Sequence, residues 1–294
     1  MFFKKREIVE LLQTMRDNFW TIEMIRDSKL KKVYVRYHDI LRNKCLFYIG
    51  IYLSTVVSFF VGPLLSEGEV LSYECYRPPW LTYHQLLCVV NICGTTITLF
   101  TLIPVDMLFM SVITLTTMQF LLLNEELQNV VQDEIEGKDV ERTIRRCIRH
   151  HSFLLNYMRR INEVFSMRLV LFFGIILITM CLEMYRSTCP DSDWKTFAES
   201  ILYTTSGLYE FLSCYCFPVQ FLINQADKVS EIIYQTNWYK SRYRGQSAFF
   251  MILLGQKGVK IAAGGVVNID FATGLSTVKT MVSYCMFLKS IDID

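Results

Sequence analysis

Residues 45–65 limit the possible folds of this chain more than any other feature, because the run is apolar and carries no charged side chain. A helix of this length spans about 30 Å, the thickness of the hydrocarbon core of a bilayer. Inside a bilayer the backbone polar groups must find partners within the protein, and a helix satisfies them locally. The run therefore predicts a membrane-spanning helix. The composition agrees, since 52% of the residues are hydrophobic and 14% are aromatic.

A second apolar stretch, residues 86–123, is nearly twice the length of an ordinary span and is interrupted only by Pro104 and Asp106. It could form a hairpin of two spans or one long helix that leaves the bilayer. Lys and Arg gather in the cytosolic segments of membrane proteins. Segments 1–44 and 124–167 are both basic, so an even number of crossings should separate them. One span at 45–65 followed by one long helix meets that condition.

Further apolar runs lie at 169–185, at 200–223 and at 269–291. The helix at 200–223 is expected to be broken near Pro218. The chain is thus expected to be an all-α polytopic helical bundle with long cytosolic helix extensions, five spans and its amino terminus inside. The basic, amphipathic stretch before the first span is not expected to be a cleavable signal peptide. The expected segments are a basic cytosolic stretch at 1–44, four spans within 45–223 around a cytosolic helical segment at 124–167, a cytosolic anchor segment at 224–268, and the last span at 269–291.

Two of the cytosolic segments also show helical periodicity. Ile8, Leu11, Met15 and Phe19 recur at helical spacing with charged residues between them, which predicts an amphipathic helix. Residues 144–165 repeat this pattern. Both helices have an apolar stripe that can pack against a partner.

No enzyme signature is present: HExxH, GxSxG, a glycine-rich phosphate loop and paired CxxC motifs are all missing from the sequence. His150 and His151 are adjacent, but neighbouring helical residues point about 100° apart and no third ligand is spaced to join them. They are predicted to be a pair on a helix surface, without a metal or another cofactor. Cys75 and Cys189 fall in short outer loops, and the sequence leaves open whether they are bridged.

Ionisable side chains inside predicted spans usually face a protein interior or a water-filled cavity, because a charge at the bilayer centre costs about 2.5 kcal/mol or more. Asp106 could instead lie near the inner headgroups. Glu210 is expected to be a buried, hydrogen-bonded acid. Lys279 would be solvated by a pore or would extend its amine to the interface along its aliphatic stem.

The last span interleaves hydroxyl side chains with apolar ones. A polar stripe opposite an apolar stripe fits a helix that lines a pore. Hydroxyl groups are also common contacts between helices within a bilayer, so the composition leaves both interpretations open. The stripe consists of Ser276, Thr277, Thr280, Ser283 and Ser290.

The order of several motifs resembles a known family. The pieces IIYQTNWYKS, MILLGQKGVKIAAGG and IDFATGLSTVKTMVSYCMFLKSI closely resemble the carboxy-terminal signature of insect odorant receptors. Earlier pieces agree: FFKKREIVELL resembles the loop after the family's second span, VDMLF its fourth span, and CIRHHSFLLNYMRRINEVFS the helix entering its fifth. The five crossings resemble spans three to seven of seven, so the chain looks like a fragment, an isoform or a truncated gene model.

The resemblance also implies roles for individual residues. Gly274 stands where a phenylalanine is usual, which is expected to loosen the start of the last helix. The last helix would line a central pore of a tetramer, with pore and gate residues Lys279, Thr280, Ser283, Phe287 and Ile291. The odorant pocket would lie in the outer half of the bundle, with candidate residues Phe59, Phe60, Val90, Tyr203 and Leu208. A cytosolic anchor between subunits would include Tyr234, Trp238 and Tyr239.

The function expected from this resemblance is an odorant-gated cation channel in the plasma membrane of olfactory sensory neurons. Its expected partners are a small odorant molecule, membrane lipid and the family's co-receptor in a hetero-tetramer, and no nucleic acid. One alternative is a heptahelical receptor coupled to G proteins, which would place the amino terminus outside, against the charge distribution. The other alternative is an inactive remnant, because two spans are missing.

Overall fold

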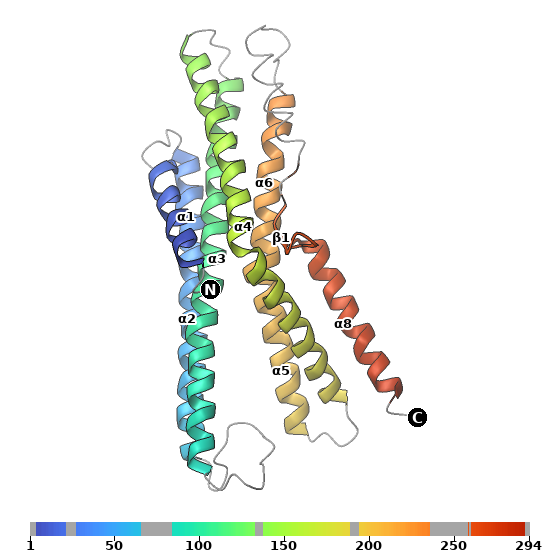
Figure 1. Cartoon of the computed structure of the whole chain (residues 1–294). Helices are drawn as coiled ribbons and strands as arrows, with labels where there is room; N and C mark the ends of the chain where they lie inside the picture. Colours follow the sequence, from blue (N-terminus) through green and yellow to red (C-terminus); the bar gives the residue numbers. More distant parts are fainter. Residues whose placement is uncertain are drawn as a thin grey trace. The chain divides into compact units, whose positions relative to one another are not determined.

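The computed structural model describes residues 4–21, 28–65, 84–132, 138–188, 194–235, 258 and 260–291, and these are almost entirely helical (Figure 1). The predicted all-α class is confirmed. The chain forms two compact units, one of Met1–Lys32 with Val112–Asp294 and one of Val33–Ser111. The helices are α1 (Lys5–Asn18), α2 (Ser28–Leu65), α3 (His84–Gln132), α4 (Lys138–Thr188), α5 (Trp194–Glu210), a π-helical turn η3 (Phe211–Cys216), α6 (Phe217–Tyr234) and α8 (Phe271–Ile291).

The Val33–Ser111 unit consists of most of α2 and the first part of α3. Asp39 and Arg42 pair at 3.2 Å in the basic half of α2. The helix then continues into the apolar run 45–65 without a break, and Leu46, Phe47 and Leu53 are exposed there. Such apolar side chains are expected on the lipid side of a membrane helix.

The long stretch that begins near residue 86 is one helix, as the charge argument predicts. α3 continues through Pro104 to Gln132. Asp106 is buried within the protein. Two parts of the described helices, Ile103–Asn129 in α3 and Arg142–Ser187 in α4, are long and apolar enough to cross a membrane. The five-span arrangement remains a prediction.

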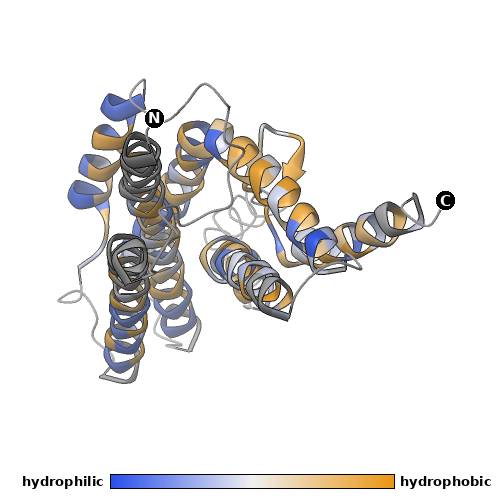
Figure 2. Cartoon of the chain, turned by 90° about the horizontal axis from the view of Figure 1, so that it is seen from below, coloured by the Kyte–Doolittle hydropathy of each residue, from blue (hydrophilic) through white to orange (hydrophobic). Residues whose placement is uncertain are grey.

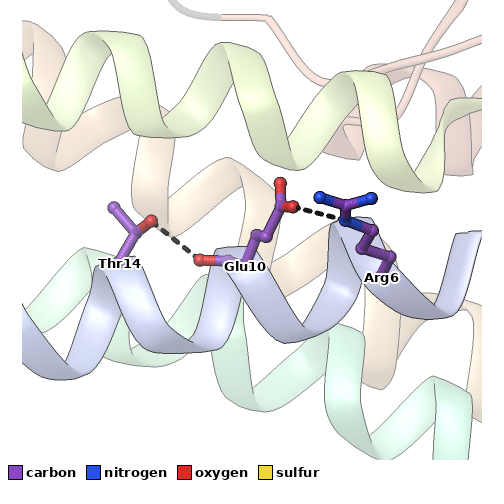
Figure 3. A network of polar contacts seen from close by, with 3 residues as sticks. All are labelled: Arg6, Glu10 and Thr14. Atoms are coloured by element: carbon purple, nitrogen blue, oxygen red, sulfur yellow. Dashed lines mark hydrogen bonds and ion pairs between the residues drawn. The ribbon is translucent and has the colours of Figure 1, made fainter.

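α1 is the amphipathic helix that the periodicity predicts, and it lies antiparallel along the charged half of α4. The Lys4 ammonium donates to the Glu163 carbonyl at 2.8 Å, and the Tyr157 hydroxyl donates to the Leu11 carbonyl at 3.3 Å. The opposite face of α1 is polar, as its colouring in Figure 2 shows. On that face Arg6 pairs with Glu10 at 3.2 Å, and the Thr14 hydroxyl donates to the Glu10 carbonyl (Figure 3).

α4 combines a charged half and an apolar half in one continuous helix. Its charged half packs against α1 and contributes most of the buried side chains on this helix, including Leu154, Tyr157 and Ile161. The apolar half packs against α5 and α8 on one side. Its other side exposes a stripe at helical spacing, which is expected to face lipid; the stripe consists of Met167, Leu171, Ile175, Ile178 and Leu182.

The predicted break near Pro218 is a π-helical turn rather than an interruption. Residues 211–216 form η3, and Pro218 follows in the first turn of α6. A proline has no N–H to donate to the carbonyl four residues earlier, and its ring crowds that carbonyl. The wider π turn accommodates this without ending the helix. The Tyr215 ring stacks on Phe172 of α4 at 4.3 Å.

A short hairpin leads into the last helix. Strands β1 (Ala262–Ala263) and β2 (Val267–Asn268) pair antiparallel, with Ala262 opposite Asn268. Gly264 and Gly265 form the turn at φ 61° and 71°, a left-handed conformation that favours glycine. The hairpin contacts α4 (Figure 1).

Candidate functional site

The candidate site is α8, which has one buried face and one exposed face. Gly274, Thr277, Met281 and Cys285 are buried at helical spacing, on the side that contacts α4 and η3. At about 100° per residue, a second set of side chains lies within an arc of about 60° on another side of the helix. This set, which we call the open face of α8, consists of Ser276, Thr280, Ser283 and Phe287, all of them exposed.

The open face contains most of the predicted pore residues. Thr280 and Ser283 lie at its centre, and Phe287 is 57% exposed. Lys279 is exposed beside this arc rather than within it. Ile291 ends α8, but its side chain lies outside the described residues. The Thr280 hydroxyl donates to the Ser276 carbonyl at 3.0 Å, so it is satisfied within its own helix.

The start of α8 is closely packed, which differs from the looser start expected from Gly274. A Cβ atom at this position would lie 3.0 Å from Leu212 Cδ2 and 3.2 Å from Cys216 Sγ. The missing side chain therefore allows the backbone of α8 to approach η3. The Phe271 N–H also donates to Gln220 Oε1 at 3.3 Å.

The predicted odorant-pocket residues are distributed over three helices. Phe59 lies with Phe60 in α2, and Val90 lies in α3, but these three side chains are outside the described residues. Tyr203 on α5 is 48% exposed, and Leu208 is half-buried. Nearby, Ser200 Oγ and Thr204 Oγ1 are buried and have no hydrogen-bond partner among the described residues. Glu210, at the end of α5, is half-buried rather than buried.

Of the predicted anchor residues, the described part of the chain includes Tyr234, which is 72% exposed at the end of α6. Trp238 and Tyr239 lie outside it, as do Cys75 and Cys189. The exposed ring of Tyr234 is available for contact with another chain. The subunit-anchor role remains a prediction.

The prediction of a surface histidine pair was wrong, because His150 is 6% and His151 0% exposed. His150 stacks on Trp20 at 4.1 Å, and Phe120 contacts His151 edge-on at 6.3 Å. The pKa of each imidazole is lowered to about 4; burial is the cause for His151 and the largest cause for His150, to which His151 and Arg146 add. Among the described residues, no group of three metal-ligating side chains is close enough to hold an ion.

The histidines belong to a packed cluster that sequence reasoning missed. Gln119 of α3 accepts from the Trp20 N–H at 2.8 Å and donates to the Trp20 carbonyl at 3.1 Å. Arg146 lies over the Trp20 ring at 5.2 Å and pairs with Glu126. Trp20 and Gln119 are distant in sequence, so no local spacing could reveal the contact. The cluster holds α1 against α3 and α4.

A family model described as 7tm Odorant receptor matches residues 1–282 of the chain. The chain belongs to this odorant receptor family. Odorant receptor 22a of Drosophila melanogaster is 26% identical over 149 residues, which are 50% of this chain and 37% of that protein. Odorant receptor 13a of the same species is 22% identical over 263 residues, covering 81% of this chain and 62% of that protein. The receptor chain thus spans less than two thirds of the length of these relatives.

Two solved structures share the fold of this odorant receptor chain. The insect olfactory receptor OR5 from Machilis hrabei matches with a TM-score of 0.79 at 10% identity, over 98% of this chain and 75% of that one. The same receptor in complex with eugenol matches with a TM-score of 0.76 at 11% identity, over 97% of this chain and 75% of that one. The predicted resemblance is confirmed. The chain belongs to a membrane-embedded receptor family rather than to an enzyme family.

Proposed function

We propose that the chain is a subunit of an odorant-gated cation channel that assembles with the family's co-receptor in the plasma membrane of olfactory sensory neurons. The main support is the open face of α8. This face is turned away from the contacts that α8 makes with α4 and η3. A helix that borders a pore between subunits needs such a face, with its other side packed on its own subunit.

The open face supplies two kinds of side chain. The hydroxyl groups of Thr280 and Ser283 can contact water. The exposed Phe287 ring can narrow the path one turn farther along, and a constriction of bulky apolar side chains closes a pore by excluding water. Gating then requires no charged plug.

The ligand is proposed to be a small, largely apolar odorant. Support comes from the fold shared with the receptor whose structure contains eugenol. Tyr203 and Leu208 of α5 are candidate contacts, together with Phe59, Phe60 and Val90. Such a ligand opens the channel only if it binds the open state more tightly than the closed state.

The test uses cysteine substitutions read out by current in cells that also express the co-receptor. A panel of odorants that includes eugenol is applied first. A water-soluble, positively charged thiol reagent is then applied to Ser283→Cys and to Val282→Cys. Val282 is also exposed but lies about 100° away on the helix, which makes it a matched control.

The reagent is expected to reduce the odorant-evoked current of Ser283→Cys and to leave Val282→Cys and the unsubstituted chain unchanged. Loss of current in Val282→Cys alone would assign the pore to a different face of α8. A chain that reaches the cell surface with the co-receptor but carries no odorant-evoked current would refute the proposal.

A further inference from the structure

The hairpin before α8 is fixed to α4 by two polar side chains one helical turn apart. Asn162 Oδ1 accepts from the Ala262 N–H at 2.8 Å. Ser166 Oγ accepts from the Gly264 N–H at 2.9 Å and donates to the Ala262 carbonyl at 3.3 Å. The Gly264 N–H also approaches the Ser166 carbonyl at 3.4 Å. Backbone groups of the hairpin thus find partners on α4.

The contact is close as well as polar. A Cβ atom on Gly264 would lie 2.7 Å from Val170 Cγ2, nearer than carbon atoms normally approach, and Gly264 has a left-handed φ of 61°. Ala262 and Ala263 are buried at this contact. Only small side chains fit between the hairpin and α4, so the hairpin cannot slide along the helix without losing its contacts.

The segment between the hairpin and α8 is short and well bonded. The Ile269 N–H donates to the Ile261 carbonyl at 2.8 Å, which closes the hairpin at its base. Asp270 follows directly, and its carboxylate accepts from the Thr273 N–H at 2.7 Å as the N-cap of α8. The helix begins at Phe271. The hairpin on α4 and the first turn of α8 are therefore connected by a short, hydrogen-bonded segment.

We propose that Asn162 and Ser166 are positioning residues that latch the hairpin onto α4, so that the start of α8 follows any movement of α4. The inference deepens the proposed function and rests on it only for its consequence in gating. The latch lies where the charged half of α4 passes into its apolar half. It is therefore one point at which a shift of α4 reaches the start of the proposed pore helix, beside the direct packing of α8 on α4.

The disruptive variants are Asn162→Leu and Ser166→Ala, separately and combined, because they remove the side-chain acceptors and introduce no new hydrogen-bonding group. The conservative variants Asn162→Asp and Ser166→Thr retain an oxygen at each position. Thr179→Ala is the matched control, because the Thr179 hydroxyl bonds to the Ile175 and Ile176 carbonyls of its own helix. If the double variant fails to fold, the Ser166→Ala single variant carries the test.

The first measurement is amide hydrogen exchange of the full chain in lipid nanodiscs. Loss of one hydrogen bond is expected to raise local opening roughly fivefold. Exchange should accelerate by about that factor at residues 261–269 and also at 271–275. The conservative variants and Thr179→Ala should exchange as the unsubstituted chain does. Faster exchange at 261–269 with no change at 271–275 would overturn the proposal, because the hairpin would then be free without affecting α8.

The second measurement is odorant-evoked current with the co-receptor, at equal amounts of protein on the cell surface. Because the latch transmits movement, the disruptive variants should raise the half-maximal odorant concentration roughly fivefold, and the conservative variants should restore it. An unchanged half-maximal concentration in variants with faster exchange would refute the role in gating. If the unsubstituted chain passes no current, the channel function fails, and hydrogen exchange alone decides whether the latch positions α8.

Discussion

Acidification from pH 7 to pH 5 is expected to raise the population in which α1 is released from α4, and His150 is the group responsible. In the packed state its ring stacks on Trp20 at 4.1 Å and on Phe153 at 5.9 Å, so it is held neutral in an apolar site. The Arg146 guanidinium close by further disfavours a charged imidazole. When α1 lifts away, Trp20 leaves the ring and water can stabilise the imidazolium.

The direction of the effect follows from the pKa of His150, which burial lowers from 6.5 to about 4. Below pH 6.5 the released state binds a proton that the packed state does not bind until about pH 4. The packed state therefore loses stability as the pH falls through this window. At about 1.4 kcal/mol per pH unit, the loss for one imidazole is at most about 2 kcal/mol between pH 7 and pH 5, because His151 and Arg146 stay beside His150 on α4. The population with α1 released should rise by at most roughly thirtyfold.

The assay is hydrogen exchange of residues 5–18 at both pH values, corrected for the intrinsic pH dependence of exchange. His150→Phe is the matched variant, because a phenyl ring can stack on Trp20 but cannot take up a proton. The acid-induced release should be present in the unsubstituted chain and absent in this variant. Equal release in both chains, or in neither, would refute the role of His150.

Two further substitutions test other contacts of the same unit. Gly274→Phe should force α8 away from Leu212 and Cys216, an overpacking that costs about 1–3 kcal/mol. A lower yield of folded protein in detergent is the expected result, with Gly274→Ala intermediate because its Cβ alone would lie 3.0 Å from Leu212 Cδ2. A normal yield for the phenylalanine would contradict the prediction. Tyr157→Phe removes the hydrogen bond to the Leu11 carbonyl, which costs about 1 kcal/mol. Amide hydrogen exchange in α1 should therefore be roughly fivefold faster. An unchanged exchange rate would mean that the 3.3 Å contact contributes nothing to holding α1 in place.

Much of the helical architecture could be predicted from sequence, because hydrophobic periodicity and charge asymmetry are local or additive signals. The spacing from Ile8 to Phe19 gave α1, and the Lys and Arg distribution correctly favoured one continuous α3 over a hairpin. The resemblance of the sequence motifs to insect odorant receptors then indicated the family. The exposed positions of Thr280 and Ser283 also follow from helical spacing, although their role at a pore stays a prediction.

Contacts between distant residues were not predictable in the same way. His150 and His151 look like surface residues because Arg145, Arg146 and Arg149 closely precede them in sequence, but α1 and α3 cover them. Nothing in the spacing of Asn162 and Ser166 shows that a hairpin about 100 residues later will use them. Because Gly274 has no side chain, the sequence predicted a loosely packed start of α8. In the structure the same missing side chain lets η3 pack closely against α8.

The π-helical turn η3 sets the rotation of α5 about its own axis relative to α6, because the three segments form one continuous helix. A π turn holds one more residue than an α turn, and each residue of an α-helix corresponds to about 100° of rotation. Deleting one residue between 211 and 216 would therefore turn α5 by about 100° about its axis while α6 stayed in place. Tyr203 would then point in a new direction. The direction in which α5 presents its aromatic side chains is thus set by a residue count about two turns away from them.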